Sequence, residues 1–309
     1  MQEITDYDKV FETLVQETQD YIVGNNLSAM VLGISGGIDS TVVAAICHEV
    51  SKRTNIPLIG RSLPSQHNKE GETTTADLVG KAFCDDYRVS PLEYIDIAMW
   101  CVRKEDIKQN KLANGNIQAR LRMIYLYNLA SINKGLVMDT DNLTENNLGY
   151  FTIHGDVGDF NPIGGLWKTE VFKLAEWLLS YYSFQLPHNM YEATAEQLEK
   201  SGKIFQQGKA IKESLKLKPT AGLGITNNDL EEIGAESYDQ VDDVLKVILA
   251  WKMITVPQKY NSNNFIMSDF MSELTHIPEE IIKNVAKRHF ASEFKRKQLP
   301  IKIIRDKIV

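Results

Sequence analysis

The sequence has few cysteines, no excess of positive charge and no long apolar run, and each absence argues against a class of protein. Cys47, Cys84 and Cys101 are its three cysteines, and none belongs to a Cys-x-x-Cys pair, so neither a disulfide scaffold nor a cysteine-ligated metal site is indicated. The net charge of −7 gives no overall basic field for nucleic acid. No apolar run of about eighteen residues indicates a membrane span, and no leader indicates secretion. We therefore expect a cytoplasmic protein with reduced thiols.

Apolar runs typical of short strands alternate with helical patterns in the first half of the chain. Strands are expected at residues 29–32, 56–61, 94–97 and 135–138, and helices at 6–24, at 41–50, after a polar loop up to Phe83, and at 117–133. This alternation predicts an α/β fold with a doubly wound parallel sheet flanked by helices. Ligands of such sheets bind at the carboxyl ends of the strands.

The second half of the chain has mainly helical patterns. Helices are expected at residues 171–179, 241–253 and 278–291. Residues 180–218 are polar and have no strand pattern, so they form either an extended helical insert or a mobile flap. At the other end of the chain, the helix at 6–24 has an apolar stripe from Tyr7 to Ile22. That stripe can pack either on its own domain or on a second copy of the chain.

A glycine-rich loop, Gly33-Ile34-Ser35-Gly36-Gly37-Ile38-Asp39-Ser40, joins the first expected strand to the next helix. Adjacent glycines let the backbone turn sharply and approach a ligand closely. The helix start directs free N–H groups and a positive dipole end at the loop, which favours phosphate. Two serine hydroxyls can add hydrogen bonds, and Asp39 can hold the Mg²⁺ of a nucleotide. A bare Gly-Gly turn is more often an ordinary corner, but these features together predict ATP binding.

A second polar cluster follows the strand expected at 135–138. Residues Thr140–Glu145 come directly after it, and the glycine-rich stretch Gly149–Pro162 carries Asp156 and Asp159. Acidic residues in such loops can hold a divalent cation, or bind a ribose or an amine. Taken singly, Asp156 and Asp159 fit turn formers equally well, and Glu145 fits a solvated helix residue.

The ordered combination of motifs resembles the ammonia-dependent nicotinamide adenine dinucleotide (NAD) synthetases. The first loop is similar to the pyrophosphate loop of the ATP pyrophosphatase (PP-loop) superfamily, and it lacks the Gly-Lys-Ser/Thr ending of a Walker loop. Further matching segments follow in order: Gly115-Asn116-Ile117-Gln118-Ala119-Arg120, Gly149–Asp156, Lys218-Pro219-Thr220-Ala221 and Tyr238-Asp239-Gln240-Val241-Asp242. The resemblance covers most of residues 5–300. It implies an adenine nucleotide alpha hydrolase-like fold in a single domain, residues 1–309.

The resemblance also implies a reaction. ATP and Mg²⁺ would activate the nicotinate carboxylate of nicotinic acid adenine dinucleotide (deamido-NAD) as an acyl-adenylate, and ammonia would then displace AMP to leave NAD. The roles carried over are catalysis by Asp39, Asp156 and Lys168; ATP binding by Gly33, Ile34, Ser35, Gly36, Gly37, Ile38, Asp39, Ser40, Thr140, Lys168 and Thr220; substrate binding by Arg120, Asp159 and Lys295; and Mg²⁺ binding by Asp39 and Glu145.

Three positions depart from the family pattern: Ile153 and Gly222 replace a Lys and an Asp, and Phe294 replaces a His beside Lys295. Two rival interpretations are another ATP pyrophosphatase, such as a GMP or asparagine synthetase or a tRNA thiolase, and a catalytically silent nucleotide-binding regulator. A thiolase would be expected to show paired cysteines or a basic RNA face. The regulator is disfavoured because Asp39, Glu145, Lys168 and Thr220 are all retained.

The family also implies partners. Because the pyrophosphate loop begins at Gly33, the expectation is a chain with no glutaminase domain, which uses free ammonia. A separate glutaminase subunit remains an alternative source of ammonia. The remaining expectations are a homodimer, small-molecule substrates only, and no nucleic acid or membrane as partner.

Overall fold

A computed structural model describes residues 3–65, 68, 70–91, 111–186, 194–219, 229–254, 274–296 and 301–302. Its centre is a parallel sheet with the strand order β3-β2-β1-β4, formed by β1 (Met30–Gly33), β2 (Leu58–Ser62), β3 (Asp86–Val89) and β4 (Leu136–Val137). A parallel bridge between Met138 and Phe160 continues it to β5 (Phe160–Asn161), which pairs with β6 (Ile301–Lys302). The α/β fold with a parallel sheet is therefore confirmed.

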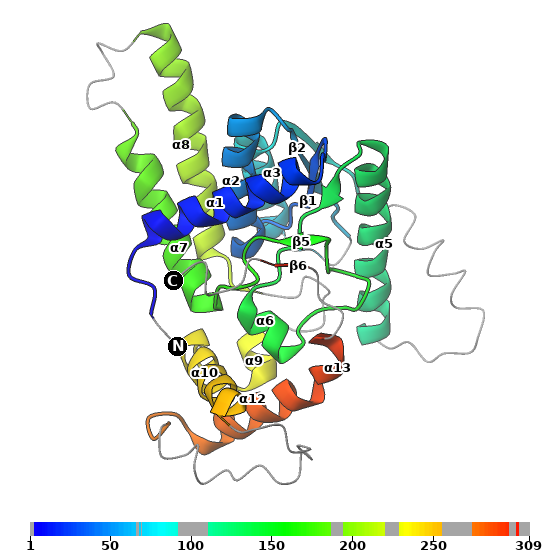
Figure 1. The fold of residues 1–309 in the computed structure, drawn as a ribbon, viewed down its shortest axis with the longest axis vertical. Helices are drawn as coiled ribbons and strands as arrows, with labels where there is room; N and C mark the ends of the chain where they lie inside the picture. Colours follow the sequence, from blue (N-terminus) through cyan, green and yellow to red (C-terminus); the bar gives the residue numbers. More distant parts are fainter. Residues whose placement is uncertain are drawn as a thin grey trace, which may run out of the picture.

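Helices cover both faces of this sheet (Figure 1). One face carries α1 (Tyr7–Gly24), α2 (Ile38–Thr54), α3 (Glu70–Phe83), α7 (Lys168–Phe184) and α8 (Ala195–Lys216), and the other carries α5 (Lys111–Ile132). Side chains along a strand point alternately to the two faces. Accordingly, Met30 and Leu32 belong to the larger core cluster, whereas Val31 packs with Met123 and Leu126 of α5.

A separate apolar cluster is formed by α6 (Leu143–Leu148), α9 (Asp229–Ile233), α10 (Tyr238–Ile254) and α12 (Glu279–Ala291), with the short α13 (Glu293–Arg296) following. These helices lie below the sheet in Figure 1. Trp167, which is fully buried, belongs to this cluster and directly precedes α7. The helices expected at 241–253 and 278–291 are therefore confirmed. Within the described residues, no helix is long and apolar enough to span a membrane.

One strand escaped the sequence analysis. A strand at Asp86–Val89 was not predicted, and the strand expected at 94–97 lies outside the described residues. Strand β3 is an edge strand whose residues are half-buried or exposed. Because two of its four residues are charged, it lacks the apolar run that marked the buried strands.

Within the polar segment 180–218, the structure describes a helix. This helix, α8, packs against α7 and α3, and its residues Ile204, Ala210 and Ile211 are buried in the main core. Near its end, the Ser214 hydroxyl lies 2.7 Å from that of Thr41 in α2. Of the two alternatives for this segment, residues 195–216 follow the helical one.

The apolar stripe of α1 packs on its own domain. Val10, Phe11, Leu14 and Ile22 are buried in the main core, and Phe11 contacts Trp177 of α7 with a ring-centroid distance of 5.4 Å. The expectation that this stripe offers a surface for a second copy of the chain is therefore wrong. Its apolar area is already used within one chain.

Replacing Gly80 with Ala is expected to lower the free energy of unfolding by about 1–3 kcal/mol, as overpacking of a core does. A Cβ at this helical position would lie 2.1 Å from the ring of Tyr87 in β3. The matched substitution Gly202→Ala in α8 meets nothing within 4 Å and should stabilise by up to about 1 kcal/mol, the helix-propensity difference. Denaturant unfolding measures both, and equal effects of the two variants would contradict this packing.

Candidate active site

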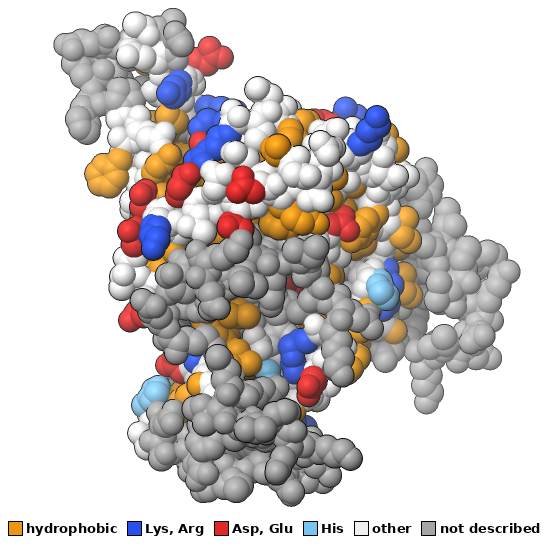
Figure 2. Space-filling model, in the orientation of Figure 1, with side chains coloured by type: hydrophobic (Ala, Val, Ile, Leu, Met, Phe, Trp, Pro, Cys, Tyr) orange, Lys and Arg blue, Asp and Glu red, His pale blue; other side chains and the backbone are white. Residues whose placement is uncertain are grey.

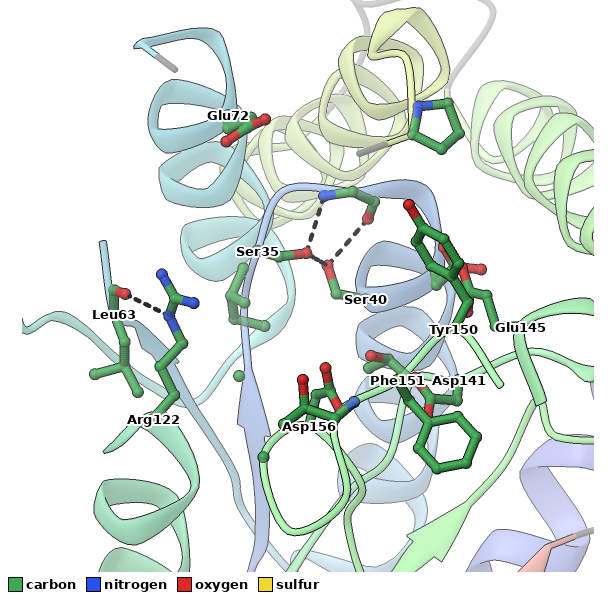
Figure 3. Close-up of a pocket in the computed structure, with 18 of the residues that line it drawn as sticks. Ser35, Ser40, Leu63, Glu72, Arg122, Asp141, Glu145, Tyr150, Phe151 and Asp156 are labelled. Atoms are coloured by element: carbon green, nitrogen blue, oxygen red, sulfur yellow. Dashed lines mark hydrogen bonds between the residues drawn. The ribbon is translucent and has the colours of Figure 1, made fainter. Parts of the chain in front are cut away.

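The glycine-rich loop lies at the carboxyl end of β1 and runs into the first turn of α2 (Figure 3). A hydrogen bond between the Ser35 and Ser40 hydroxyls, which are 3.0 Å apart, connects the two ends of the loop. The Gly37 N–H donates to Ser35 Oγ at 3.2 Å, and Ser40 Oγ donates to the Gly37 carbonyl at 3.0 Å. Gly37 is the N-cap of α2 and supplies no side-chain cap. The helix start is thus open to an anion.

Gly36 is needed for the close packing of this loop on α3. Its φ is +85°, and a Cβ there would lie 2.5 Å from the Glu72 carbonyl oxygen and 2.7 Å from the Ala76 nitrogen. Any other residue would combine an unfavourable backbone conformation with a clash against backbone atoms. The adjacent glycines therefore have different tasks: Gly36 allows the helix contact, and Gly37 begins α2.

Asp39, Lys168 and Glu145 come together from three helix starts. The Lys168 ammonium donates to Asp39 Oδ2 at 2.5 Å and to Glu145 Oε1 at 3.0 Å. Asn142, which caps α6 through a capping box with Glu145, also donates to Asp39 Oδ1 at 2.9 Å. Only 16% of the Asp39 side chain is exposed, because these partners cover it. The carboxylate of Asp39 therefore belongs to a charge cluster.

The electrostatics of the cluster follow from one ammonium facing two carboxylates. Burial, together with Asp39, raises the pKa of Glu145 to about 8, although Lys168 opposes the shift. Burial alone would lower the pKa of Lys168, but Asp39 and Glu145 raise it well above its usual value. Lys168 is therefore charged at neutral pH. Its single positive charge cannot neutralise the two negative charges that Asp39 and Glu145 can carry.

Three more carboxyl groups lie in the segment after β4, and two of them, Asp141 and Asp156, line the same cavity. Burial raises the pKa of Asp139 and Asp156 to about 7, and burial and Asp139 raise that of Asp141 well above its usual range. Asp139 accepts backbone N–H bonds from Asp141 and Gly158. The Oδ2 atom of Asp141, by contrast, is buried without a hydrogen-bond partner. The site therefore has an excess of acidic oxygen.

These residues surround a cavity of about 670 Å³. Twelve of the residues predicted for the site line it: Gly33, Ile34, Ser35, Gly37, Ile38, Asp39, Ser40, Thr140, Glu145, Asp156, Lys168 and Lys295. In Figure 3, Ser35, Ser40, Glu145 and Asp156 lie around the same space. Segments that are far apart in the sequence thus contribute to one cavity, as the order of the motifs predicted.

Three predicted residues lie apart from the cavity lining. These are Gly36, Arg120 and Asp159. Arg120 is exposed, and the Asp159 carboxylate accepts the Val137 N–H at 2.9 Å. Thr220 lies outside the described residues. Lys295 does line the cavity, but its ammonium donates to the carbonyls of Gly149 and Phe151 at 2.8 and 2.6 Å. Lys295 thereby fixes the Gly149–Asp156 loop through two of its backbone carbonyls.

Sequence reasoning missed the basic residues on the opposite wall. Arg122, two residues after Arg120, lines the cavity and donates from Nε to the Leu63 carbonyl at 3.0 Å (Figure 3). Arg61 of β2 also lines it, and its guanidinium is paired with Asp86 at 2.8 Å. The sequence offered a partial signal, because Arg122 lies two residues from Arg120 on the same expected helix, but this position does not decide which arginine faces the cavity.

The donor set fits a divalent cation. Among the described residues, no three His, Cys, Asp or Glu side chains are already grouped around a metal position. However, Asp39 and Glu145 present carboxylate oxygens, which are the ligands that Mg²⁺ prefers. The unpartnered Asp141 Oδ2 and the raised pKa values of the carboxyl groups show that further positive charge would stabilise the site.

Comparisons with known proteins show the family of this chain. The family described as NAD synthase matches residues 10–299. An NH(3)-dependent NAD(+) synthetase of Campylobacter jejuni is 29% identical over 248 residues, which cover 79% of this chain and 84% of that protein. Among solved structures, an NMN synthetase from Francisella tularensis has a TM-score of 0.69 at 24% identity, covering 95% of this chain and 97% of that one. An NH3-dependent NAD synthetase from C. jejuni has a TM-score of 0.64 at 23% identity, covering 96% and 98%.

Proposed function

Since this chain belongs to the NAD synthase family and is an NAD synthetase enzyme, we propose that it amidates the nicotinate carboxylate of deamido-NAD with ammonia and ATP. The observation that carries the proposal is the meeting of Asp39, Lys168 and Glu145 beside the open start of α2. That arrangement offers hydrogen-bond donors and positive charge to phosphates, and carboxylate oxygens to a cation. Thr140, which also lines the cavity, and Thr220 remain proposed ATP contacts.

In this proposal, a carboxylate becomes an acyl donor only after one of its oxygens joins a phosphate leaving group. Ser35, Gly37 and Ser40 would hold the pyrophosphate through N–H and O–H donors at the helix start. The Lys168 ammonium would neutralise charge that develops on the phosphate oxygens as the acyl-adenylate forms. Arg120 and Asp159 remain proposed substrate contacts, although neither lines the cavity.

Asp39 and Glu145 would hold Mg²⁺, which supplies charge neutralisation on the phosphates when it is bound. Asp156 would act in the second half of the reaction. Its buried carboxyl group lines the cavity, and burial raises its pKa to about 7. A group that titrates near neutral pH can accept a proton from ammonium as the amide forms.

The purified protein is expected to form NAD from deamido-NAD, ATP and ammonium chloride, with AMP and pyrophosphate as products. Ammonia-free glutamine at the same concentration should give no NAD, because the proposed donor is free ammonia. Liquid chromatography of the products measures both. Equal NAD formation from glutamine would overturn the choice of ammonia as donor.

The same assay tests the proposed substrate. Nicotinic acid mononucleotide is the informative alternative, because one structural neighbour is an NMN synthetase. A higher kcat/KM for the mononucleotide than for deamido-NAD would show that the mononucleotide is the substrate. The proposed amide-forming chemistry would be unchanged.

We also propose a homodimer, formed through the outer face of α5 and not through α1. Ile124 and Ile132 on that helix are 66% and 70% exposed, and Tyr127 beside them is 40% exposed. Figure 2 shows orange side chains on this face of the molecule where α5 lies. A self-complementary apolar patch of this kind is typical of twofold dimers.

Wild-type protein is accordingly expected to show the mass of a dimer by light scattering at micromolar concentration. Ile124→Lys should shift the mass towards the monomer, because it buries a charge at the centre of the interface. A fully active wild-type monomer would overturn the dimer. A dimeric Ile124→Lys protein would overturn only its location.

A further inference from the structure

The segment Tyr238–Asp242 of α10 contacts the active-site helices from outside the cavity. Asp242 is completely buried, and its side chain faces the starts of two helices. Its Oδ1 accepts the Thr144 hydroxyl of α6 at 2.5 Å. Its Oδ2 accepts the backbone N–H and the hydroxyl of Thr169 in α7, at 3.1 and 2.8 Å. One carboxylate therefore ties α6 and α7 together at their first turns.

The residues that Asp242 holds are the immediate neighbours of the charge cluster. Thr144 precedes Glu145, and Thr169 follows Lys168. Thr144 Oγ1 also accepts the backbone N–H of Lys168 at 2.8 Å, so a continuous chain of hydrogen bonds runs from Lys168 through Thr144 to Asp242. Since Asp242 lies outside the cavity lining, its carboxylate acts on the site through these threonines.

The hydrogen-bond donors of this network converge on Asp242 and require an acceptor there. Both threonine hydroxyls and the Thr169 N–H donate to Asp242, and a carboxylate offers acceptor positions on both oxygens. The first N–H groups of a helix have no partner within the helix, and the helix start attracts negative charge. Asp242 therefore accepts a backbone N–H that has no partner within α7, and its negative charge interacts favourably with the dipoles of α6 and α7. An amide in its place would turn an NH₂ group towards one of these donors.

We propose that Asp242 is a positioning residue for the synthetase reaction, which sets the separation of Lys168 and Glu145 by fixing the first turns of α6 and α7. A ring contact from the same segment supports this role, because the Lys168 ammonium lies 5.6 Å from the centre of the Tyr238 ring. Tyr238 thus contacts the lysine directly, while Asp242 acts on it through Thr144 and Thr169.

The test measures kcat and KM for ATP and deamido-NAD in Asp242→Asn, and it rests on the proposed function. Loss of the fixed geometry should lower kcat about 10- to 100-fold, as a misplacement of about 1 Å does, with a smaller change in KM for deamido-NAD. Asp243→Asn is the matched control, since it removes the same charge from the next position of α10, where the side chain is 40% exposed. It should keep kcat within twofold of wild type.

Two further comparisons separate positioning from a general loss of stability. Gly80→Ala weakens the fold at a residue that does not itself line the cavity, so it should lower the melting temperature without lowering kcat below the melting range. Thr169→Val removes one hydroxyl donor to Asp242, and Thr169→Ser restores it. Activity should fall in the valine variant and return in the serine variant, which keeps the test valid even where Asp242→Asn does not fold.

The outcomes separate this inference from the function on which it rests. If wild-type protein forms no NAD, the proposed reaction fails. If wild-type protein is active and Asp242→Asn keeps its kcat, or loses no more than Gly80→Ala at equal folded fraction, the positioning role is overturned. Equal activity of Thr169→Val and Thr169→Ser would overturn it as well. Circular dichroism at the assay temperature gives the folded fraction of each variant.

Discussion

Replacing Asp39 with Asn is expected to lower kcat/KM for NAD formation by about 10²–10³-fold while the protein stays folded, the loss seen when one charge-stabilising group leaves an active site. Asn keeps the size of the side chain and one oxygen acceptor, but it removes the charge that faces Lys168 Nζ at 2.5 Å. It also removes one of the two proposed ligands of Mg²⁺. Steady-state rates over a range of Mg²⁺ concentrations measure the effect.

The matched control for this variant is Asp8→Asn. Asp8 lies in the first turn of α1 and is exposed, so the same charge is removed from an equivalent helix position far from the site. Its rate should equal that of wild type. Near-normal turnover of Asp39→Asn at saturating Mg²⁺ would mean that Asp39 is not a ligand, and the assignment of the site would fail.

Lys168→Met is expected to reduce both activity and stability. Lys168 is 1% exposed and contacts both Asp39 and Glu145, so its removal leaves two largely buried carboxylates without their shared cation. Removing one partner from a buried ion pair costs about 3–5 kcal/mol of unfolding free energy. Activity should fall by at least about 10²-fold, because the charge that would neutralise the phosphate is lost.

Lys173→Met on the same helix is the control, since Lys173 is half-exposed and pairs only loosely with Glu3 at 3.6 Å. It should change stability by less than about 1 kcal/mol, as exposed pairs do. The double variant Asp39→Asn with Lys168→Met tests the pairing itself, because removing both partners should cost less than the sum of the single changes. Additive stability losses would contradict the ion pair.

The fold could be predicted from the sequence wherever one physical signal dominated. The strand β1 is a continuous apolar run and β2 begins with one, because both of their faces are covered, which is the pattern of a buried parallel strand. The edge strand β3 has no such coverage, so its charged residues concealed it. The apolar stripe of α1 was visible, but a stripe carries no information about which surface covers it.

The site was predictable as a set of motifs more than as a geometry. The sequence placed Asp39 and Glu145 at the ends of two strands, and the parallel sheet brings those ends together. It could not show that Lys168 lies between them, because that contact depends on how α7 begins after the buried Trp167. Nor could spacing alone show that Arg122, and not Arg120, turns into the cavity.

The pairing of β5 with β6 bears on the order in which this protein folds. Phe160 pairs with Ile301, and closing a loop of about 140 residues costs chain entropy before any contact compensates for it. Contacts of such long range generally form late, and during synthesis β6 leaves the ribosome only after the residues that precede it. Since β5 follows the Gly149–Asp156 loop and is joined to β4 by a single bridge, this wall of the cavity is expected to take its final shape among the last steps. A nascent chain would therefore hold its glycine-rich loop in place before this wall of the cavity is complete.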